Sequence, residues 1–332
     1  MQVFIEALCA GCDAYGVDAE LVLVEWNPPP DRPRLREALR WPRSSRCAVR
    51  IVEVPHALHA GFGTGTALPM HQMIAKNVGI RRARGAFVLA TNIDIVLSEA
   101  VWERIARRDL LADRFYRVDR CDVASDVPES RPLTEQLDAC RATVFRRHER
   151  DATRDLRDGT TSRIWRPMWQ LVAGSALSPL AVLPVLREPL RKARRSLSRA
   201  RRFGRLHTNA SGDFTLLHRD RWHELGGYWE YTGFPLHVDG LLCYAAKRLG
   251  LSEEVMAAPA CAYHIDHGHG TGYQEYHQQS SFWTDHARQG IMRLTGDEFA
   301  ALVDVIHRDG RLSSPTQHVW GLAEASLVEV IA

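Results

Sequence analysis

The first part of the chain alternates between two patterns of hydrophobic and polar residues. Stretches with apolar side chains at helical spacing are followed by short runs rich in Val, Ile and Leu. The predicted helices cover 3–15 and 68–83, and the predicted strands cover 19–26, 48–55 and 86–91. This alternation is typical of a parallel sheet that helices cover on both faces.

The pattern is interrupted in the middle of the sequence. A helix over 98–110 and a strand over 114–123 are followed by residues 124–205, which are rich in Arg, Pro and Ser and show little periodicity. Regular patterns then return. A strand, a helix and a glycine turn are predicted within 211–231, a helix over 237–250, and a short strand that ends at His264.

We therefore expect an α/β fold with one mostly parallel sheet. Its predicted parts are a first half over 1–123, an Arg-rich helical or irregular insertion over 124–205, and a second half with C-terminal helices over 206–332. Such a sheet usually begins with a strand, whereas this sequence opens on a helix. We expect a further strand to be encoded upstream of Met1, unless the sheet manages without its usual first strand.

Composition changes this picture little. With 332 residues and 45% hydrophobic content the chain can bury a sizeable core, and its net charge of +3 is small, so we expect no nucleic-acid partner. The seven cysteines are an odd number scattered along the chain, which does not suggest a disulfide framework. No secretory signal pattern follows Met1, and we expect a cytoplasmic protein.

One segment could contact a membrane. The apolar run 171–186 is too short and too interrupted by proline for a membrane span, and nine basic residues follow it within 187–205. An apolar segment beside a basic helix can lie on an anionic surface, which would place residues 171–205 at the inner membrane face. The alternatives are an insertion with a solvated basic face, or contact with an acidic or phosphorylated partner.

Polar side chains follow the predicted strands. In parallel sheets ligands bind beyond the carboxyl ends of the strands. Residues of this kind at those positions are Glu25, Asn27, His56, Asn92 and Asp94. A second group of metal-ligand types, His264, Asp266, His267 and His269, follows the last predicted strand. We therefore expect the candidate chemistry at these ends.

Three segments together resemble family-two-like glycosyltransferases of the GT-A fold. The segment AKNVGIRRARGAFVLATNIDIVLS, residues 75–98, is similar to the family's helix, strand and Asp-x-Asp motif, and GDFTLLHRDRWHELGGYWE, residues 212–230, looks like a later stretch ending in a glycine turn. HVDGLLCYAA, residues 237–246, looks like the helix with the catalytic carboxylate. The resemblance covers roughly residues 19–123 and 206–270, and it implies that 1–123 is a nucleotide-sugar-binding half and 206–332 an acceptor or catalytic half. Asn92 departs from the pattern, since the family has its first Asp there, and the leading strand is absent.

The resemblance implies a metal site. Asp94 would bind Mn²⁺ or Mg²⁺, with Asn92 adding an amide oxygen or orienting a water, because a nucleotide-sugar donor leaves as a diphosphate whose charge a cation neutralises. His264 would be a further ligand, with His267 as its alternative. The other interpretations are that Asp94 caps a turn and that each histidine is an ordinary surface or core residue.

The resemblance also implies a base and a donor site. Asp239 would accept the proton of the acceptor hydroxyl, although an N-terminal helix carboxylate is also favoured by the helix dipole alone. The implied donor contacts are Glu25, Asn27, Lys76, Asn77, Asn92 and Asp213. For Asp213 an ordinary turn carboxylate is an equal alternative.

The leading hypothesis is therefore a metal-dependent, inverting glycosyltransferase with a nucleotide-diphosphate sugar as donor and an acceptor that no motif specifies. A metal-dependent hydrolase is a second hypothesis, built on the cluster from His264 to His269 with His56 and His59. A third is a non-catalytic relative that binds sugar nucleotides, suggested by Asn92 and the absent strand. The transferase would bind metal weakly unless a nucleotide diphosphate were present, whereas the hydrolase would need a compact site made of protein ligands.

Overall fold

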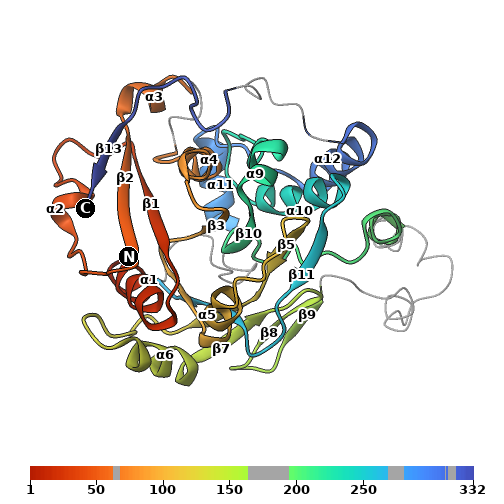
Figure 1. The fold of residues 1–332 in the computed structure, drawn as a ribbon. Helices are drawn as coiled ribbons and strands as arrows, with labels where there is room; N and C mark the ends of the chain where they lie inside the picture. The colour runs from red at the N-terminus through yellow and green to blue at the C-terminus, as the bar shows by residue number, and fades with distance from the viewer. Residues whose placement is uncertain (63–67, 164–193, 268–279, 311, 313–318) are drawn as a thin grey trace.

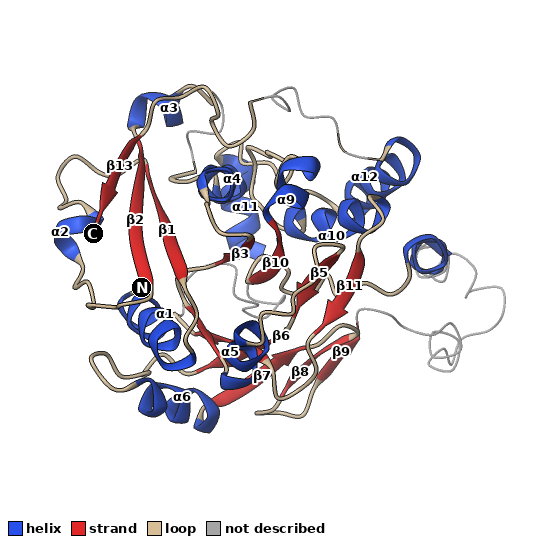
Figure 2. Ribbon diagram, viewed as in Figure 1, coloured by secondary structure: helices blue, strands red, loops and turns tan. Residues whose placement is uncertain are grey.

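The structure is a computed structural model of the 332-residue chain. It describes all residues except 63–67, 164–193, 268–279, 311 and 313–318. Helices and strands alternate along the first part of the chain, as the ribbon views show (Figures 1 and 2). The predicted α/β class is confirmed at this coarse level.

The described strands form three sheets. Their orders are β1-β2-β13, β11-β5-β10-β3 and β4-β12-β6-β7-β8-β9. The strands are β1 (Ala19–Trp26), β2 (Cys47–Val54), β3 (Phe87–Thr91), β4 (Ile95–Leu97), β5 (Arg114–Arg117), β6 (Asp119–Val123), β7 (Val144–His148), β8 (Ala152–Asp155), β9 (Thr161–Arg163), β10 (Phe214–His218), β11 (Ser252–Val255), β12 (Cys261–Ile265) and β13 (Val328–Ile331).

The sheets are mixed, so the expectation of one mostly parallel sheet was wrong. Parallel pairs join β1 to β2, β5 to β11, and β6 to β12, while the other described pairs are antiparallel. Strands β6 to β9 form a chain of antiparallel neighbours, as successive strands do when their connections lack a crossover. Strand β10 pairs antiparallel with β3, so segments far apart in sequence build the second sheet.

Two described strands are edges of neighbouring sheets. β1 pairs with β2 only, and β3 pairs with β10 only, within the part of the chain that the structure describes. Helix α4 (Gln72–Arg82) contacts both strands.

The helices cover the sheets through separate cores. In one core α1 and α5 pack on β1, β2 and β4, and in another α9, α10 and α12 pack near β3 and β10. The remaining helices are α1 (Gln2–Tyr15), α2 (Leu35–Ala38), α3 (His56–Ala60), α5 (Glu99–Ala106), α6 (Leu133–Ala142), α9 (Arg219–Leu225), α10 (Val238–Arg248), α11 (Ser280–Arg288) and α12 (Gly296–Asp309). The predicted helices 3–15 and 237–250 correspond to α1 and α10.

Two expectations for the middle of the chain needed correction. The strand predicted over 114–123 is divided at the buried Val118, because β5 belongs to the second sheet and β6 to the third. The segment 124–205 was expected to be helical or irregular, yet besides the helix α6 it contains the strands β7, β8 and β9. A few apolar and polar side chains of this segment are buried against β6, and this burial stabilises its helix and strands. The sequence of the segment nevertheless shows no sustained hydrophobic periodicity.

Part of the basic stretch forms ion pairs with acidic residues elsewhere in the protein. Residues 194–203 form a helix whose Arg195 pairs with Asp297 and whose Arg202 lies 2.5 Å from Asp304, both on α12. Arg205 pairs with Asp151 at 2.6 Å. The apolar run 171–186 and the rest of the basic stretch lie outside the described residues. Among the described helices, none combines the length and apolar character needed to cross a bilayer.

Candidate functional site

Strand pairing brings the metal-ligand candidates together. The chain leaves β3 at Thr91, turns through Asp94 and enters β4 at Ile95. Because β4 pairs antiparallel with β12, Ile95 lies opposite His264, and the N–H of Ile265 donates to the carbonyl of Asp94 at 2.9 Å. This register places the end of β12 beside the turn that carries Asp94.

Asp94, His264 and His267 form a group that could hold a metal ion. One ligand atom from each residue lies within 4.8 Å of the others. Asp94 Oδ2 is 3.4 Å from His264 Nε2 and 3.3 Å from His267 Nε2, whereas the buried Asp94 Oδ1 has no hydrogen-bond partner among the described residues. A carboxylate with two imidazoles suits Mn²⁺ and also matches the ligand types of catalytic zinc sites.

The charges of this group are mutually dependent. Burial opposes the charged form of His264, but the carboxylates of Asp122 and Asp94 outweigh it and raise the pKa of His264 to about 9. Burial likewise disfavours the Asp94 anion, and the neighbouring His264 and His267 still leave its pKa below the ordinary value. The group therefore favours an ionised Asp94, the form that binds a cation.

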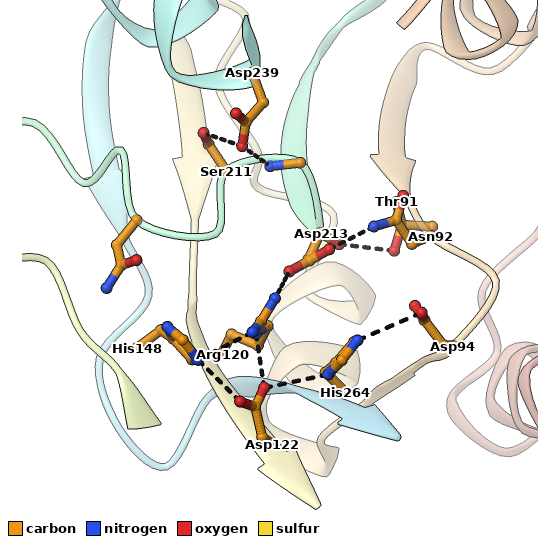
Figure 3. A network of polar contacts seen from close by, with 12 residues as sticks. Thr91, Asn92, Asp94, Arg120, Asp122, His148, Ser211, Asp213, Asp239 and His264 are labelled. Carbon is orange, nitrogen blue, oxygen red and sulfur yellow. Dashed lines mark hydrogen bonds and ion pairs between the residues drawn. The ribbon is translucent and has the colours of Figure 1, made fainter. Parts of the chain in front are cut away.

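A second layer lies behind His264, as Figure 3 shows. Asp122 on β6 is 3% exposed, and its Oδ1 is 3.2 Å from His264 Nδ1. His148 Nε2 is 3.0 Å from Asp122 Oδ2, and the Arg146 guanidinium lies 3.5 Å from the same oxygen. The buried carboxylate is thus surrounded by groups that can carry positive charge.

Arg120 joins this layer to a different part of the site. Its Nε lies 2.8 Å from Asp122 Oδ1, and its Nη1 donates to Asp213 Oδ2 at 2.7 Å (Figure 3). Burial disfavours the Arg120 cation, but the two aspartates more than compensate and raise its pKa. Asp213 in turn accepts a hydrogen bond of 2.6 Å from the Asn92 amide. A continuous polar network therefore runs from Asp94 to Asp213.

Asp239 lies in the first turn of α10, which begins after His237 in a left-handed conformation (φ 68°). Its Oδ2 accepts hydrogen bonds from Ser211 Oγ at 2.7 Å and from the Gly212 N–H at 2.6 Å, as Figure 3 shows. A Cβ at position 212 would lie 3.3 Å from that oxygen, so glycine permits the close approach. Among the described residues, no hydrogen bond to Oδ1 is found.

Lys76 interacts electrostatically with the three candidate aspartates. Its ammonium donates to the Gly212 carbonyl, so Gly212, whose N–H donates to Asp239, is hydrogen-bonded through both of its backbone polar groups. Burial lowers the pKa of Lys76, while Asp213, Asp239 and Asp94 oppose that shift. All three aspartates therefore favour the charged form of this half-buried lysine.

Asn77 has a different environment from its neighbour Lys76. It is fully buried, its Oδ1 accepts from the Tyr228 N–H at 2.7 Å, and its amide nitrogen donates to the Tyr228 carbonyl at 2.8 Å. The amide also donates to Glu230 at 3.1 Å. Gly227 has φ 72°, and a Cβ there would come within 2.3 Å of Asn77 Oδ1. Asn77 therefore supports the turn after α9, and both polar atoms of its side chain are already used within the protein, so neither is left for a nucleotide-sugar donor.

Glu25 and Asn27 lie at the end of β1, apart from this network. Glu25 accepts from the Leu35 N–H at 2.9 Å, and Asn27 (φ 49°) contacts His56 Nδ1 at 2.9 Å. Among the described residues, no hydrogen bond or ion pair joins either residue to Asp94 or Asp239. A role of Glu25 and Asn27 at the donor stays a prediction.

The wider histidine cluster of the hydrolase hypothesis is only partly assembled. His59 is buried and accepts from the Trp26 indole N–H at 3.0 Å. Within the described residues, His56 and His59 belong to no metal-ligand group, and His269 lies outside those residues. The hydrolase hypothesis therefore rests on Asp94, His264 and His267.

The second layer was not predicted from the sequence. Arg120, Asp122 and His148 are charged or titratable residues on strands, where such residues usually face solvent. The one available signal was alternation in the segment RFYRVDRCDV, which places Arg120 and Asp122 on the same side of a strand.

The chain was also compared with known proteins. No family model matches it, and no curated protein matches it. The geometry of the described residues therefore carries the functional argument.

Proposed function

We propose that the protein is a metal-dependent glycosyltransferase that moves a sugar from a nucleotide-diphosphate donor to an acceptor hydroxyl. The observation that carries this proposal is that a metal-ligand group is connected to the loop that holds the candidate base. Asp94, His264 and His267 form a metal-ligand group, and the network through Arg120 and Asp213 connects it to the loop that holds Asp239.

Asp94, His264 and His267 would hold the metal. A bound Mn²⁺ or Mg²⁺ would stabilise the negative charge of the departing diphosphate. Two imidazoles make the ligand set softer than an all-oxygen site, so we expect Mn²⁺ to bind more tightly than Mg²⁺. Asn92 is bonded to Asp213 and also accepts from Gln72 at 3.2 Å, so we propose that it shapes the turn instead of coordinating the metal.

Asp239 would supply the base. Ser211 and Gly212 fix Oδ2, and Oδ1 would accept the acceptor's proton as the hydroxyl oxygen forms a bond to the anomeric carbon. The bond from that carbon to the diphosphate oxygen breaks with its electron pair on the leaving group. A single displacement of this kind inverts the anomeric configuration.

The ligand set also favours a second candidate, a metal hydrolase. Two histidines and one carboxylate with an open position are the protein ligands of several catalytic zinc sites. This candidate needs tight metal binding by the protein alone. It gives no role to the anchored carboxylate of Asp239.

Calorimetric titration separates the candidates. UDP and GDP are titrated into the full chain with and without Mn²⁺, and Zn²⁺ is titrated without nucleotide. The transferase proposal predicts that one nucleotide binds at least about tenfold more tightly with Mn²⁺. Tight Zn²⁺ binding with no effect of either nucleotide would favour the hydrolase, and metal-dependent nucleotide binding without transfer of any sugar would leave a binding protein.

A further inference from the structure

His264 lies between two carboxylates that contact opposite nitrogens of its ring. Its Nδ1 is 3.2 Å from Asp122 Oδ1, and its Nε2 is 3.4 Å from Asp94 Oδ2. His264 is 6% exposed and Asp122 is 3% exposed, so water does not compete freely for these atoms. The ring is therefore oriented with Nε2 toward the metal-ligand group and Nδ1 toward the interior.

The backbone fixes this arrangement. His264 on β12 is the parallel partner of Asp122 on β6, and β12 pairs on its other side with β4, which follows Asp94 directly. Two more side chains, Arg120 at 2.8 Å and His148 at 3.0 Å, restrain the Asp122 carboxylate. The Asp122 carboxylate cannot rotate away from His264 without separating from these partners.

The hydrogen-bonding needs of two buried atoms support the same orientation of the His264 ring. His264 Nδ1 and Asp122 Oδ1 are both buried and lie 3.2 Å apart, and neither forms a hydrogen bond of good geometry with any group of the described chain. A proton on Nδ1 directed at Oδ1 would satisfy both atoms. With Nδ1 keeping this proton, Nε2 is the nitrogen that would lose its own proton and bind a cation.

We propose that Asp122 is a positioning residue that holds His264 as an Nε2 metal ligand. This inference rests on the proposed metal-dependent function and adds an outer carboxylate to it. Outer partners of this kind fix the tautomer of a ligating histidine and increase its basicity, and their loss typically weakens metal binding about 10- to 100-fold. Asp122 touches neither the donor nor the acceptor in this scheme.

The test is Mn²⁺ affinity, measured by electron paramagnetic resonance of free Mn²⁺ with excess UDP or GDP. Asp122→Asn should weaken Mn²⁺ binding about 10- to 100-fold. Asp155→Asn is the matched control, because Asp155 pairs with Arg146 at 3.1 Å, as Asp122 does at 3.5 Å, but forms no ion pair with His264 among the described contacts. The control should bind Mn²⁺ within about threefold of the parent.

A double substitution separates positioning from a general disturbance of the site. In a His264→Ala background, Asp122→Asn should have little further effect on Mn²⁺ affinity. Equal weakening in both backgrounds, or parental affinity in Asp122→Asn, would overturn the inference while leaving the metal site intact. If the parent itself binds no Mn²⁺ with either nucleotide, the proposed function fails and the inference fails with it.

A second measurement needs no change at Asp122, should that variant not fold. The ¹⁵N shifts of the Zn²⁺-loaded parent are recorded, and the His264 signals are assigned with His264→Gln. The inference predicts a protonated Nδ1 and a metal-bound Nε2. A metal-bound Nδ1 or an unperturbed ring would contradict it.

Discussion

Asp239 is anchored through one carboxylate oxygen, and this arrangement is compatible with the proposed role as a base. Ser211 and Gly212 bind Oδ2, while no hydrogen bond to Oδ1 is found among the described residues. Asp239→Asn keeps the size of the side chain but removes the proton acceptor. We expect donor binding to stay within about threefold and transfer to fall by roughly 10²- to 10⁴-fold, measured by single-turnover kinetics with a competent acceptor.

Ser211→Ala is the comparison for that variant. It removes one hydrogen bond to Oδ2 and retains the carboxylate, so transfer should fall much less than in Asp239→Asn. Equal losses in both variants would show that the carboxylate acts by holding the loop and that the base lies elsewhere.

Asn77 should behave as a structural residue even though it follows Lys76 in the same helical turn. Asn77→Ala removes the bonds to the Tyr228 peptide and leaves a buried N–H and a buried carbonyl without partners. We expect the free energy of unfolding to fall by about 2–4 kcal/mol, measured by denaturant unfolding. Nucleotide affinity of the folded fraction should be unchanged, and a specific loss of that affinity would restore Asn77 to the donor site.

At this scale the sequence predicts residues whose position depends on a strand end, such as Asp94 and His264. It does not predict Asp122, because nothing in its neighbourhood shows that the two histidines pack beside it. It also cannot separate Lys76 from Asn77, since a motif position does not state which way each side chain of a helix faces.

At the scale of elements, the helix over 194–203 is joined to α12 by charge. Arg202 pairs with Asp304 and Arg195 with Asp297, both near the protein surface, and the Arg199 guanidinium lies 5.7 Å from the Phe299 ring. Exposed pairs of this kind are weak singly and are screened by salt. Arg202→Asp should therefore increase amide hydrogen exchange over 194–203, with a larger effect at low salt.

The matched control exchanges the two charges. Arg202→Asp combined with Asp304→Arg restores the pair in reverse, and exchange over 194–203 should return toward that of the parent. Exchange that stays high in the double variant would mean that the ion pair does not hold this helix.

Element prediction worked where periodic runs were long and failed where they were short. The eight-residue strand β1 and the helices α1 and α10 carry enough alternation to be recognised. The three-residue β4 shows almost no alternation, although its pairing with β12 places Asp94, the residue before it, beside His264. The division of 114–123 at Val118 was also invisible, because both halves have the same strand-like pattern and only their partners differ.

For the whole molecule, the class of fold follows from the alternation of elements but the sheet topology does not. Local patterns show which residues form strands, whereas the direction of a partner depends on long connections such as the one that returns β10 beside β3. The candidate site lies where the second and third sheets meet, since Asp213 precedes β10 and Asp122 belongs to β6. Contacts between those sheets, such as the hydrogen bond from Arg120 to Asp213, could therefore not be predicted from the sequence.

The central claim is that Asp94 supplies a metal ligand that couples cation binding to nucleotide binding. The most direct test is calorimetric titration of UDP and GDP into Asp94→Ala, with and without Mn²⁺, beside the parent and the exposed-residue control Asp31→Ala. We predict that the parent and the control bind nucleotide more tightly with Mn²⁺ and that Asp94→Ala loses this dependence while remaining folded. If Asp94→Ala binds nucleotide with the same dependence on Mn²⁺ as the parent, Asp94 only shapes a turn and the proposed metal site is wrong.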